Sequence, residues 1–337
     1  MSNHLINLAD LDRDAIRELL HLTDRFVEVS QRPIPKVPAL RGRTIAMVFF
    51  EDSTRTRMSF DLAAKRLSAD VIDFPTHTSS LSKGESLQDT AETIGALGVD
   101  ALIIRHSSGG LPGEIAEAVG ETISVINAGD GLNAHPTQGL LDAYTLCQHF
   151  HGSAGIEASL SGIHVGIVGD VKHSRVARSD LAGYRSLGAK VTIVAPPELQ
   201  PTDLDNWPVD ITDDLDEVLP TLDVVGLLRI QKERMGETVV NSIDDYIERY
   251  GVTESRANRM NDNLVILHPG PVNRGIEIAD TVLDKRANVL VNQQVTNGVA
   301  VRMAVLFRLL GSGIELSLIH ISEPTRRTPI SVGGLCW

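Results

Sequence analysis

The sequence predicts an α/β protein with two domains, each a mostly parallel sheet flanked by helices. Short apolar runs of strand length alternate with segments whose apolar residues have helical spacing, a pattern typical of parallel sheets covered on both faces. The alternation stops in a segment rich in Gly, Ser and Ala, residues 148–161, and then restarts. The chain has 337 residues, which exceeds one ordinary core and suits two domains of roughly 150 residues each.

In the first half of the chain, the expected helices and strands follow one another closely. Residues 11–29 have apolar side chains at helical spacing, and the proline-rich segment 32–38 ends that helix. The apolar run 44–50 is expected to form a buried strand, and a helix follows it to about Leu67. Three further strands are expected, over residues 71–74, 100–104 and 124–127.

The second half repeats the alternation, and the chain is then expected to return to the first domain. A helix is expected around residues 174–187, among strands at 164–168, 190–195, 224–228 and 264–267. A final apolar segment of helical spacing, 295–311, completes the first domain. We therefore assign residues 1–149 and that helix to the first domain and residues 150–294 to the second. Residues 312–337 have no periodicity, and we interpret them as a non-native or disordered tail.

Composition excludes several classes of protein. The net charge of −13 disfavours nucleic-acid binding, which usually requires a basic surface, so an anionic substrate would need locally gathered cations. Cys147 and Cys336 are too few for a disulfide framework or a four-cysteine metal site, as suits a reducing cytoplasm. No signal-peptide pattern appears, and no apolar run approaches the about 20 residues that span a bilayer. We expect a cytoplasmic protein with no membrane partner.

The segment from Glu51 to Arg57 is the sharpest motif. It lies where an apolar strand is expected to turn into a helix, with Ser53 or Thr54 as candidate N-caps. Free N–H groups at a helix start bind anions, and the hydroxyl groups and Arg55 add donors suited to phosphate oxygens. A capped helix with surface arginines would explain one hydroxyl, but not three hydroxyls interleaved with two arginines.

Two further segments follow expected strands of the first domain. Arg105 and His106 come directly after the strand that ends at residue 104, where open α/β sheets bind ligands. The glycine-containing turn 127–131 is followed by His135 and Gln138, which lie three residues apart on one face of a helix start. His135 either takes part in the chemistry, as a proton carrier or a neutral donor, or caps the helix.

Four loops complete the set of polar segments. Lys83 lies in a Ser-rich loop that is either a plain surface loop or one that closes over an anion. In the second half, Arg175 follows the strand 164–168, Arg229 and Gln231 follow 224–228, and the turn 268–271 follows 264–267. The cations are all expected in loops, and together they form the local positive cluster that an acidic protein needs for anionic substrates: Arg55, Lys83, Arg105, Arg175 and Arg229.

Several other chemistries lack their motifs. The sequence has no metal-ligand spacing, no nucleophile elbow and no Walker loop. Gly166 and Gly169 do not form a dinucleotide-binding motif, and the next strand lacks the acidic residue that would hold a ribose. We therefore expect neither a metal nor a cofactor.

These motifs resemble those of the transcarbamylase family. Ser53 to Arg57 is similar to its carbamoyl-phosphate signature, and His135 to Gln138 is similar to its second phosphate-side motif. Three further segments resemble the aspartate branch of the family, namely 83–85, 229–231 and 268–271. The resemblance covers roughly residues 1–311, in order and with ordinary spacing.

The resemblance implies an enzyme that joins carbamoyl phosphate to L-aspartate, an early step of pyrimidine (UMP) synthesis. The first domain would bind carbamoyl phosphate and the second aspartate. The phosphate would be bound by Ser53, Thr54, Arg55 and Thr56. The carbonyl oxygen would be surrounded by Thr56, Arg105 and His135, and the carbamoyl amide would contact Gln138 and the backbone of Gly270 and Pro271. The carboxylates of aspartate would be bound by Lys83, Arg175, Arg229 and Gln231.

The family also implies how the chain assembles and reacts. The Lys83 loop would come from a neighbouring chain, so a homotrimer with shared active sites is expected, with Glu51 and Arg234 ordering the loops. A regulatory chain or another pathway enzyme is a possible further partner. The α-amine of aspartate would attack the carbonyl carbon without a cofactor. Charge on the oxygen would be stabilised as in an oxyanion hole, and positioning of the two anions would supply roughly 7–11 kcal/mol.

Three alternatives are carried forward. An ornithine carbamoyltransferase would share the first two motifs, but it should have a cysteine in place of Pro269 and an acidic side chain for its cationic substrate. A catalytically inactive assembly subunit of the same fold should have lost Arg55, Lys83 or Arg105, yet all are present. A dinucleotide-binding oxidoreductase should have a glycine motif that this chain lacks.

The chain also differs from the family in one position of the 268–271 turn. One familiar form of this turn has Leu where Gly270 stands, and we expect this difference to be tolerated.

Overall fold

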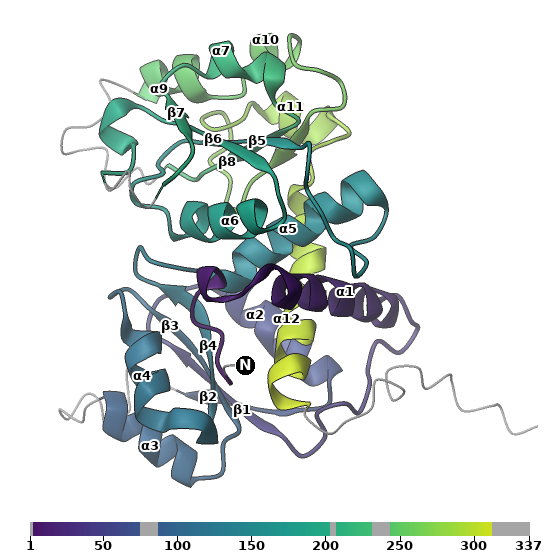
Figure 1. Cartoon of the computed structure of the whole chain (residues 1–337), viewed down its shortest axis with the longest axis vertical. Helices are drawn as coiled ribbons and strands as arrows, with labels where there is room; N and C mark the ends of the chain where they lie inside the picture. The colour runs from purple at the N-terminus through teal and green to yellow at the C-terminus, as the bar shows by residue number, and fades with distance from the viewer. Residues whose placement is uncertain (1–2, 75–86, 203–206, 231–242, 312–337) are drawn as a thin grey trace, which may run out of the picture.

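The computed structural model describes residues 3–74, 87–202, 207–230 and 243–311, which form two parallel sheets covered by helices. The two sheets lie at opposite ends of the elongated molecule, and helices pack between them (Figure 1). This arrangement confirms the predicted fold class.

The first sheet has the strand order β2-β1-β3-β4, and all of its pairings are parallel. Its strands are β1 (Thr44–Phe49), β2 (Asp70–Phe74), β3 (Ala101–His106) and β4 (Ser124–Asp130). Alternate residues of β1 face opposite sides of the sheet, so that Ile45 and Met47 join one apolar cluster while Ala46 and Val48 join another. Both clusters are buried, which explains why this strand is apolar throughout rather than alternating.

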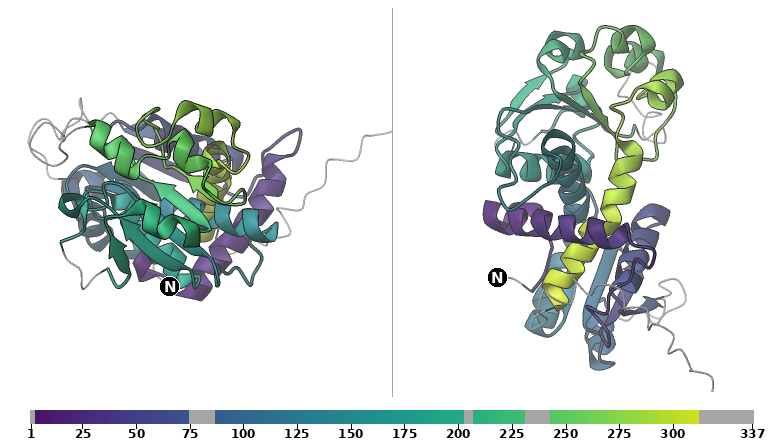
Figure 2. Two further views of the ribbon diagram at one scale, coloured as in Figure 1. Left: turned by 90° about the horizontal axis from the view of Figure 1, so that it is seen from above. Right: turned by 90° about the vertical axis from the view of Figure 1, so that its right-hand side faces the viewer.

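Different helices cover the two faces of the first sheet. The smaller cluster lies under α3 (Leu87–Ala96) and α4 (Leu111–Val119). The opposite face is covered by α1 (Arg13–Ser30), α2 (Thr54–Arg66), α5 (Pro136–His151) and α12 (Val291–Leu310). Because α12 packs on α1, α2 and α5, the last described helix adds to the core of the first sheet (Figure 2).

The second sheet has the strand order β7-β6-β5-β8-β9 and is also parallel. Its strands are β5 (His164–Val168), β6 (Lys190–Val194), β7 (Asp210–Thr212), β8 (Val224–Leu227) and β9 (Val265–Leu267). Its helices are α6 (Arg175–Ser186), α7 (Leu215–Val218), α9 (Ile243–Tyr250), α10 (Glu254–Ala257) and α11 (Asp280–Lys285).

Helix α5 packs between the two halves, against α6 on one side and α12 on the other (Figure 1). Its residues are buried almost continuously from Pro136 to Cys147. A helix that starts at the edge of the first sheet and is covered all round in this way holds its first turn rigidly between the sheets.

The expected strands and helices lie close to the observed ones, with differences at their ends. The last expected helix begins at Val291 rather than residue 295, and α5 extends to His151 into the segment expected to be a connector. The short edge strand β7 was not expected, because its three residues carry no apolar pattern. Among the described residues, no helix is both long and apolar enough to cross a membrane. The expected tail 312–337 lies outside the described residues.

Candidate active site

Polar segments leave the first sheet at the carboxyl ends of its strands. The connection 50–53 joins β1 to α2, Arg105 and His106 are the last residues of β3, and β4 leads through the 131–135 turn into α5. Arg105 was expected just after its strand and is instead part of it. Since the carboxyl ends of neighbouring parallel strands lie at one edge, these segments gather around one site.

The backbone N–H groups at the start of α2 are not capped by a side chain. Ser53 occupies the N-cap position, but its side chain makes no capping hydrogen bond, in contrast to Ser174, whose side chain accepts from Ala177 N at the start of α6. Ser53 is therefore the N-cap, as one of the two candidates, whereas Thr54 is the first residue of the helix. A helix start with free N–H groups and a free hydroxyl is suited to an anion.

The two arginines of this motif have different environments. Arg57 forms an ion pair with Asp73 of β2 on the exposed face of α2, so it lies outside the site. Arg55, in the first turn of α2, lies against Gly270, because a Cβ placed on that glycine would meet the Arg55 guanidinium at 3.0 Å. Burial and the charge of Arg229 lower the pKa of Arg55. Arg55 is thus the cation that reaches the second sheet.

Glu51 holds two arginines from different sheets side by side. Its Oε2 accepts a hydrogen bond from Arg175 Nη2 at 2.8 Å and lies 3.2 Å from Arg105 Nε. The two guanidinium groups also donate to backbone carbonyl groups, of Ala128 at 3.0 Å and Gly131 at 3.2 Å. Burial and the charge of Arg175 together lower the pKa of Arg105 to about 10, with Glu51 opposing the shift. One carboxylate therefore faces two cations, and the cluster stays positive at neutral pH.

Gly129 makes room for this pair. Its φ of +136° is unfavourable for a side chain, and a Cβ there would lie 2.6 Å from Arg105 Nη1 and 3.1 Å from Arg175 Cζ. The glycine-rich turn expected from the sequence therefore has a specific use, since it lets two arginines approach the backbone of β4.

His135 is a buried neutral base beside these cations. Its backbone N–H donates to Ser179 Oγ at 2.8 Å, and its side chain makes no capping hydrogen bond. His135 thus occupies the N-cap position of α5, as the helix-capping interpretation expects, but its ring does not bond to the helix start. Burial lowers its pKa well below 6.5, and Arg105, Arg302 and Arg175 lower it further. Its Nδ1 has no hydrogen-bond partner among the described residues, which leaves a neutral imidazole able to contact a ligand.

The side-chain amide of Gln138 donates hydrogen bonds to a buried carboxylate. Its Nε2 lies 3.1 Å and 3.0 Å from the two carboxylate oxygens of Asp142, one turn further along α5. Gln294 of α12 donates to the same carboxylate at 2.6 Å and accepts from His268 N at 3.0 Å. The amide of Gln138 is thus tied to the 268–271 turn of the second sheet.

The 268–271 turn itself has a constrained backbone. The Gly270–Pro271 peptide bond is cis, Gly270 has a φ of +65°, and its N–H donates to His268 Nδ1 at 2.7 Å. Because Nδ1 accepts this bond, the ring proton of the neutral imidazole lies on Nε2, which faces Glu277 Oε2 at 3.5 Å. The prolines and this histidine hold the backbone carbonyl groups of the turn in place.

Glu277 joins this turn to the segment after β8. It is 1% exposed, and its Oε1 accepts from Ile230 N at 2.8 Å and from Asn273 Nδ2 at 2.7 Å. Its Oε2 accepts from Asn273 N at 2.6 Å, and Asn273 Nδ2 also donates to Ile230 O at 2.8 Å. Ile230 is buried while its neighbour Arg229 is exposed, so these bonds direct Arg229 outward.

The expected site residues thus fall into three groups. The structure brings together residues from both sheets, with Thr56 and His135 buried among them: Ser53, Arg55, Thr56, Arg105, His135, Gln138, Arg175, Arg229, Gly270 and Pro271. Thr54 is exposed in the first turn of α2. Lys83, Gln231 and Arg234 lie outside the described residues. Arg55 and Arg175 were expected in loops and are instead in first helical turns.

Several residues that support the site were not predicted. Asp142, Gln294 and Arg302 are buried polar residues within helices that otherwise read as apolar, and that interruption was the available signal. Glu277 gave no local signal, because its partner Ile230 lies 47 residues earlier in the chain.

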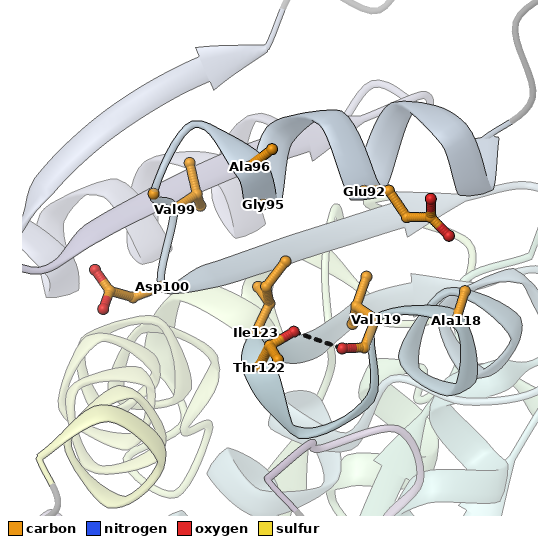
Figure 3. A pocket seen from close by; sticks show the side chains of 10 residues that line it. Glu92, Gly95, Ala96, Val99, Asp100, Ala118, Val119, Thr122 and Ile123 are labelled. Atoms are coloured by element: carbon orange, nitrogen blue, oxygen red, sulfur yellow. Dashed lines mark hydrogen bonds between the residues drawn. The ribbon is translucent and has the colours of Figure 1, made fainter.

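A surface hollow of about 420 Å³ lies elsewhere, between α3 and α4 (Figure 3). It is lined by small and apolar side chains together with Glu92, Asp100 and Thr122, and Thr122 Oγ1 donates to Val119 O at 2.6 Å. It opens near Asp100, just before β3, and therefore at the opposite end of the strand from Arg105. It contains none of the cations of the site.

The site as a whole is suited to a small, multiply anionic ligand with a carbonyl group. It offers a helix start, several arginines and a neutral histidine, with Thr56 and His135 buried among them. Across the described residues, no cluster of His, Cys, Asp and Glu side chains has the geometry to hold a metal ion.

Comparisons with known proteins agree with this chemistry. The carbamoyl-phosphate-binding domain of aspartate/ornithine carbamoyltransferases matches residues 3–148, and the Asp/Orn-binding domain of that family matches residues 161–309. The aspartate carbamoyltransferase catalytic subunit of a Nocardioides species is 52% identical over 311 residues, which cover 92% of this chain and 95% of that protein.

Solved structures are also similar. The catalytic subunit of M. jannaschii aspartate transcarbamoylase superposes with a TM-score of 0.77 at 32% identity, covering 92% of this chain and 99% of that one. The Trypanosoma cruzi aspartate transcarbamoylase, solved in complex with carbamoyl phosphate and aspartate, superposes with a TM-score of 0.74 at 30% identity, covering 90% of this chain and 94% of that one.

Proposed function

This chain belongs to the aspartate/ornithine carbamoyltransferase family, and we propose that it transfers the carbamoyl group of carbamoyl phosphate to the α-amine of L-aspartate. The product is N-carbamoyl-L-aspartate, and the reaction is an early step of pyrimidine synthesis. The observation that carries the proposal is the pair of Arg105 and Arg175, held by Glu51 beside a buried, neutral His135, at a site reached from both sheets. The name of the Nocardioides relative supports the choice of aspartate.

The phosphate group binds at the start of α2. The free hydroxyl of Ser53, the first N–H groups of the helix and the Thr54 and Thr56 hydroxyls donate to its oxygens. Arg55 adds a charged fork, and its pKa is lowered by burial and by the charge of Arg229, both of which a bound anion would offset.

The carbonyl oxygen is met by Thr56, Arg105 and His135. As the amine nitrogen bonds to the carbonyl carbon, negative charge develops on this oxygen, and preorganised donors stabilise it. A neutral His135 donates one hydrogen bond without taking up charge, which suits its depressed pKa. The bond between the carbonyl carbon and the bridging oxygen then breaks, and phosphate leaves with a proton from the amine.

The two carboxylates of aspartate are bound by the cations on the second-sheet side. The charge of Arg229 lowers the pKa of Arg55, so these two arginines lie near each other. Arg175 reaches the site from the start of α6. Lys83 and Gln231 complete this set in the proposal. Residues 1–149 with helix 295–311 form the carbamoyl-phosphate domain and residues 150–294 the aspartate domain.

A homotrimer with shared sites is part of the proposal. Met58 and Leu62 lie one turn apart on the exposed face of α2, and Ile72 is exposed on the adjacent edge strand β2. Such an apolar surface beside an open sheet edge supports burial against a neighbouring chain. We also place the enzyme in the cytoplasm, in keeping with its two cysteines.

Mixing inactive variants tests the sharing of sites. Arg55→Ala and Lys83→Ala chains, each inactive alone, are mixed under conditions that exchange subunits. Activity should return in the mixture, because some sites then combine an intact Arg55 with an intact Lys83 from the neighbour. A mixture that stays inactive although native mass spectrometry of differently tagged chains detects mixed trimers would contradict shared sites.

The activity itself is tested by supplying carbamoyl phosphate with either aspartate or ornithine and identifying the product. N-carbamoyl-aspartate alone is expected. Citrulline would retain the phosphate site and overturn the choice of second substrate. A folded trimer that forms neither product would favour an inactive assembly subunit.

A further inference from the structure

Asp142 lies at the centre of the buried polar contacts below the site. It is 2% exposed, and it accepts hydrogen bonds from Gln138 and Gln294, which come from different helices. Asp180 of α6, 7% exposed, adds a hydrogen bond from the third side. Neither aspartate contacts the region assigned to phosphate, and the proposed chemistry uses neither.

An ionised carboxylate constrains an amide neighbour because it can only accept hydrogen bonds. The amide of Gln138 must therefore turn its NH₂ group towards Asp142, and its Oε1 is left pointing away. The outward group is then an acceptor, which is what the NH₂ group of a carbamoyl ligand requires.

Gln294 is constrained in the same way on the other side. Its NH₂ group donates to Asp142 at 2.6 Å, so its Oε1 is free to accept from His268 N at 3.0 Å. His268 in turn accepts from Gly270 N. Through Gln294 and His268, Asp142 therefore also helps to position the backbone of the 268–271 turn. This backbone is the second group assigned to the carbamoyl amide.

Asp180 supplies the proton that lets two acids lie together. Burial raises the pKa of Asp180 well above 3.8, and Asp142 raises it further, so Asp180 is the protonated donor and Asp142 the acceptor. Burial raises the pKa of Asp142 to about 6, but the hydrogen bonds from Gln138, Gln294 and Asp180 and the charge of Arg302 oppose that shift, so Asp142 is ionised at neutral pH. Tyr184 lies beside Asp180, and His135 at the start of α5 stays neutral. One negative charge is therefore placed on the residue that both glutamines contact.

We infer that Asp142 is a positioning residue that sets the specificity of the site for a carbamoyl amide, by turning the acceptor oxygens of Gln138 and of the 268–271 turn towards the ligand. This rests on the proposed function only in that carbamoyl phosphate is the ligand. It explains how the site would distinguish an NH₂ group from a methyl group of the same size, since an analogue that lacks the NH₂ group leaves those acceptors unpaired.

Acetyl phosphate is the matching probe, because it has a methyl group where carbamoyl phosphate has NH₂. The dissociation constants of both ligands are measured by thermal shift for the full chain and for Asp142→Asn. The wild-type chain should prefer carbamoyl phosphate by roughly tenfold or more, the effect of one or two buried hydrogen bonds. Asp142→Asn should bind acetyl phosphate and inorganic phosphate as before and lose most of that preference, since an Asn lets Gln138 turn over.

Asp180→Asn is the matched control, with the same substitution at the other member of the pair. Its NH₂ group replaces the shared proton as a donor to Asp142, so the preference for carbamoyl phosphate should be retained. Equal loss in both variants, or a full preference in folded Asp142→Asn, would overturn the inference. So would a wild-type chain that binds the two ligands equally. The product assay with wild-type chain tests the function separately, so the two failures are distinguishable.

Discussion

Each side of the site contains one glutamate with several partners, and the two glutamates bind different kinds of group. On the first-sheet side, Glu51 contacts side chains and keeps Arg105 and Arg175 together. On the second-sheet side, Glu277 contacts mainly backbone N–H groups and holds two loops in shape. Glu51 therefore gathers the charge, including Arg175 from the start of α6, while Glu277 shapes the backbone beside the exposed Arg229.

This difference follows from what each side has to bind. A phosphate and a developing oxyanion need several cations, and close cations repel one another unless a carboxylate lies between them. A carbamoyl amide and a carboxylate need oriented acceptors and one well-placed arginine. A buried glutamate that accepts several backbone bonds is a way to fix a loop that has no regular secondary structure.

The largest effect is expected at the start of α2. Arg55→Ala should lower turnover by about 10³-fold, since removal of one charged donor to a developing charge has an effect of this size. Steady-state kinetics at saturating aspartate measures the loss. Arg57→Ala is the control on the same helix, and its activity should change little, because an exposed ion pair contributes little. A folded Arg55→Ala protein with normal turnover would contradict the phosphate assignment.

The corresponding change on the second-sheet side should be smaller and selective. Arg229→Ala should raise the concentration of aspartate needed for half-saturation by roughly 10- to 100-fold, the cost of a charged hydrogen bond. The saturation curve for carbamoyl phosphate should stay the same. If the aspartate curve were unchanged instead, Arg229 would not bind the second substrate.

Glu277→Gln tests whether the second side depends on backbone support. One of its oxygens becomes an NH₂ group that faces N–H donors, which should lower the free energy of unfolding by about 1–3 kcal/mol. Aspartate binding should weaken by roughly tenfold as Ile230 and Arg229 shift. Denaturant unfolding and aspartate saturation measure the two effects, with the exposed Glu248→Gln as control. Weaker binding of carbamoyl phosphate alone would show that Glu277 supports only the 268–271 turn.

The smallest effect concerns the stability of the first side at acidic pH. Because the pKa of His135 in the folded chain lies well below 6.5, only the unfolded chain takes up this proton as the pH falls. The wild-type chain should therefore lose stability below about pH 6.5, by up to roughly 1.4 kcal/mol per pH unit, and His135→Gln should lose less. Urea unfolding at pH 7 and pH 5 measures the difference. The exposed His151→Gln should behave as wild type, and an equal loss in all three chains would show that His135 is not the group that titrates.

The fold could be predicted well because its signals are local. Strands β1 and β3 of the first sheet are short runs that are apolar on both faces, and each of its predicted helices has helical spacing. The edge strand β7 was missed because it is short and half exposed, so its residues need not be apolar. The extension of α5 to His151 was missed because glycine and serine follow it closely in the sequence.

The candidate site could be predicted where its parts are contiguous. Ser53, Arg55 and Thr56 are recognisable together because a helix start brings consecutive residues to one ligand. The role of Arg57 could not be read in this way, since its partner Asp73 lies on another element. The same holds for Glu277 and Gln294, whose partners are 47 and 26 residues away.

By itself the sequence determined which segments carry charge and hydroxyl groups, and that those segments follow buried strands. Apolar strands and turn residues act over a few positions, so their pattern is written in the chain order. Only the tertiary structure decided that Glu51 joins arginines of two sheets, that His135 is buried and neutral, and that Asp142 orients Gln138 and Gln294. These properties depend on burial and on contacts between distant elements, because desolvation and hydrogen-bond geometry exist only once the two sheets and α5 pack together.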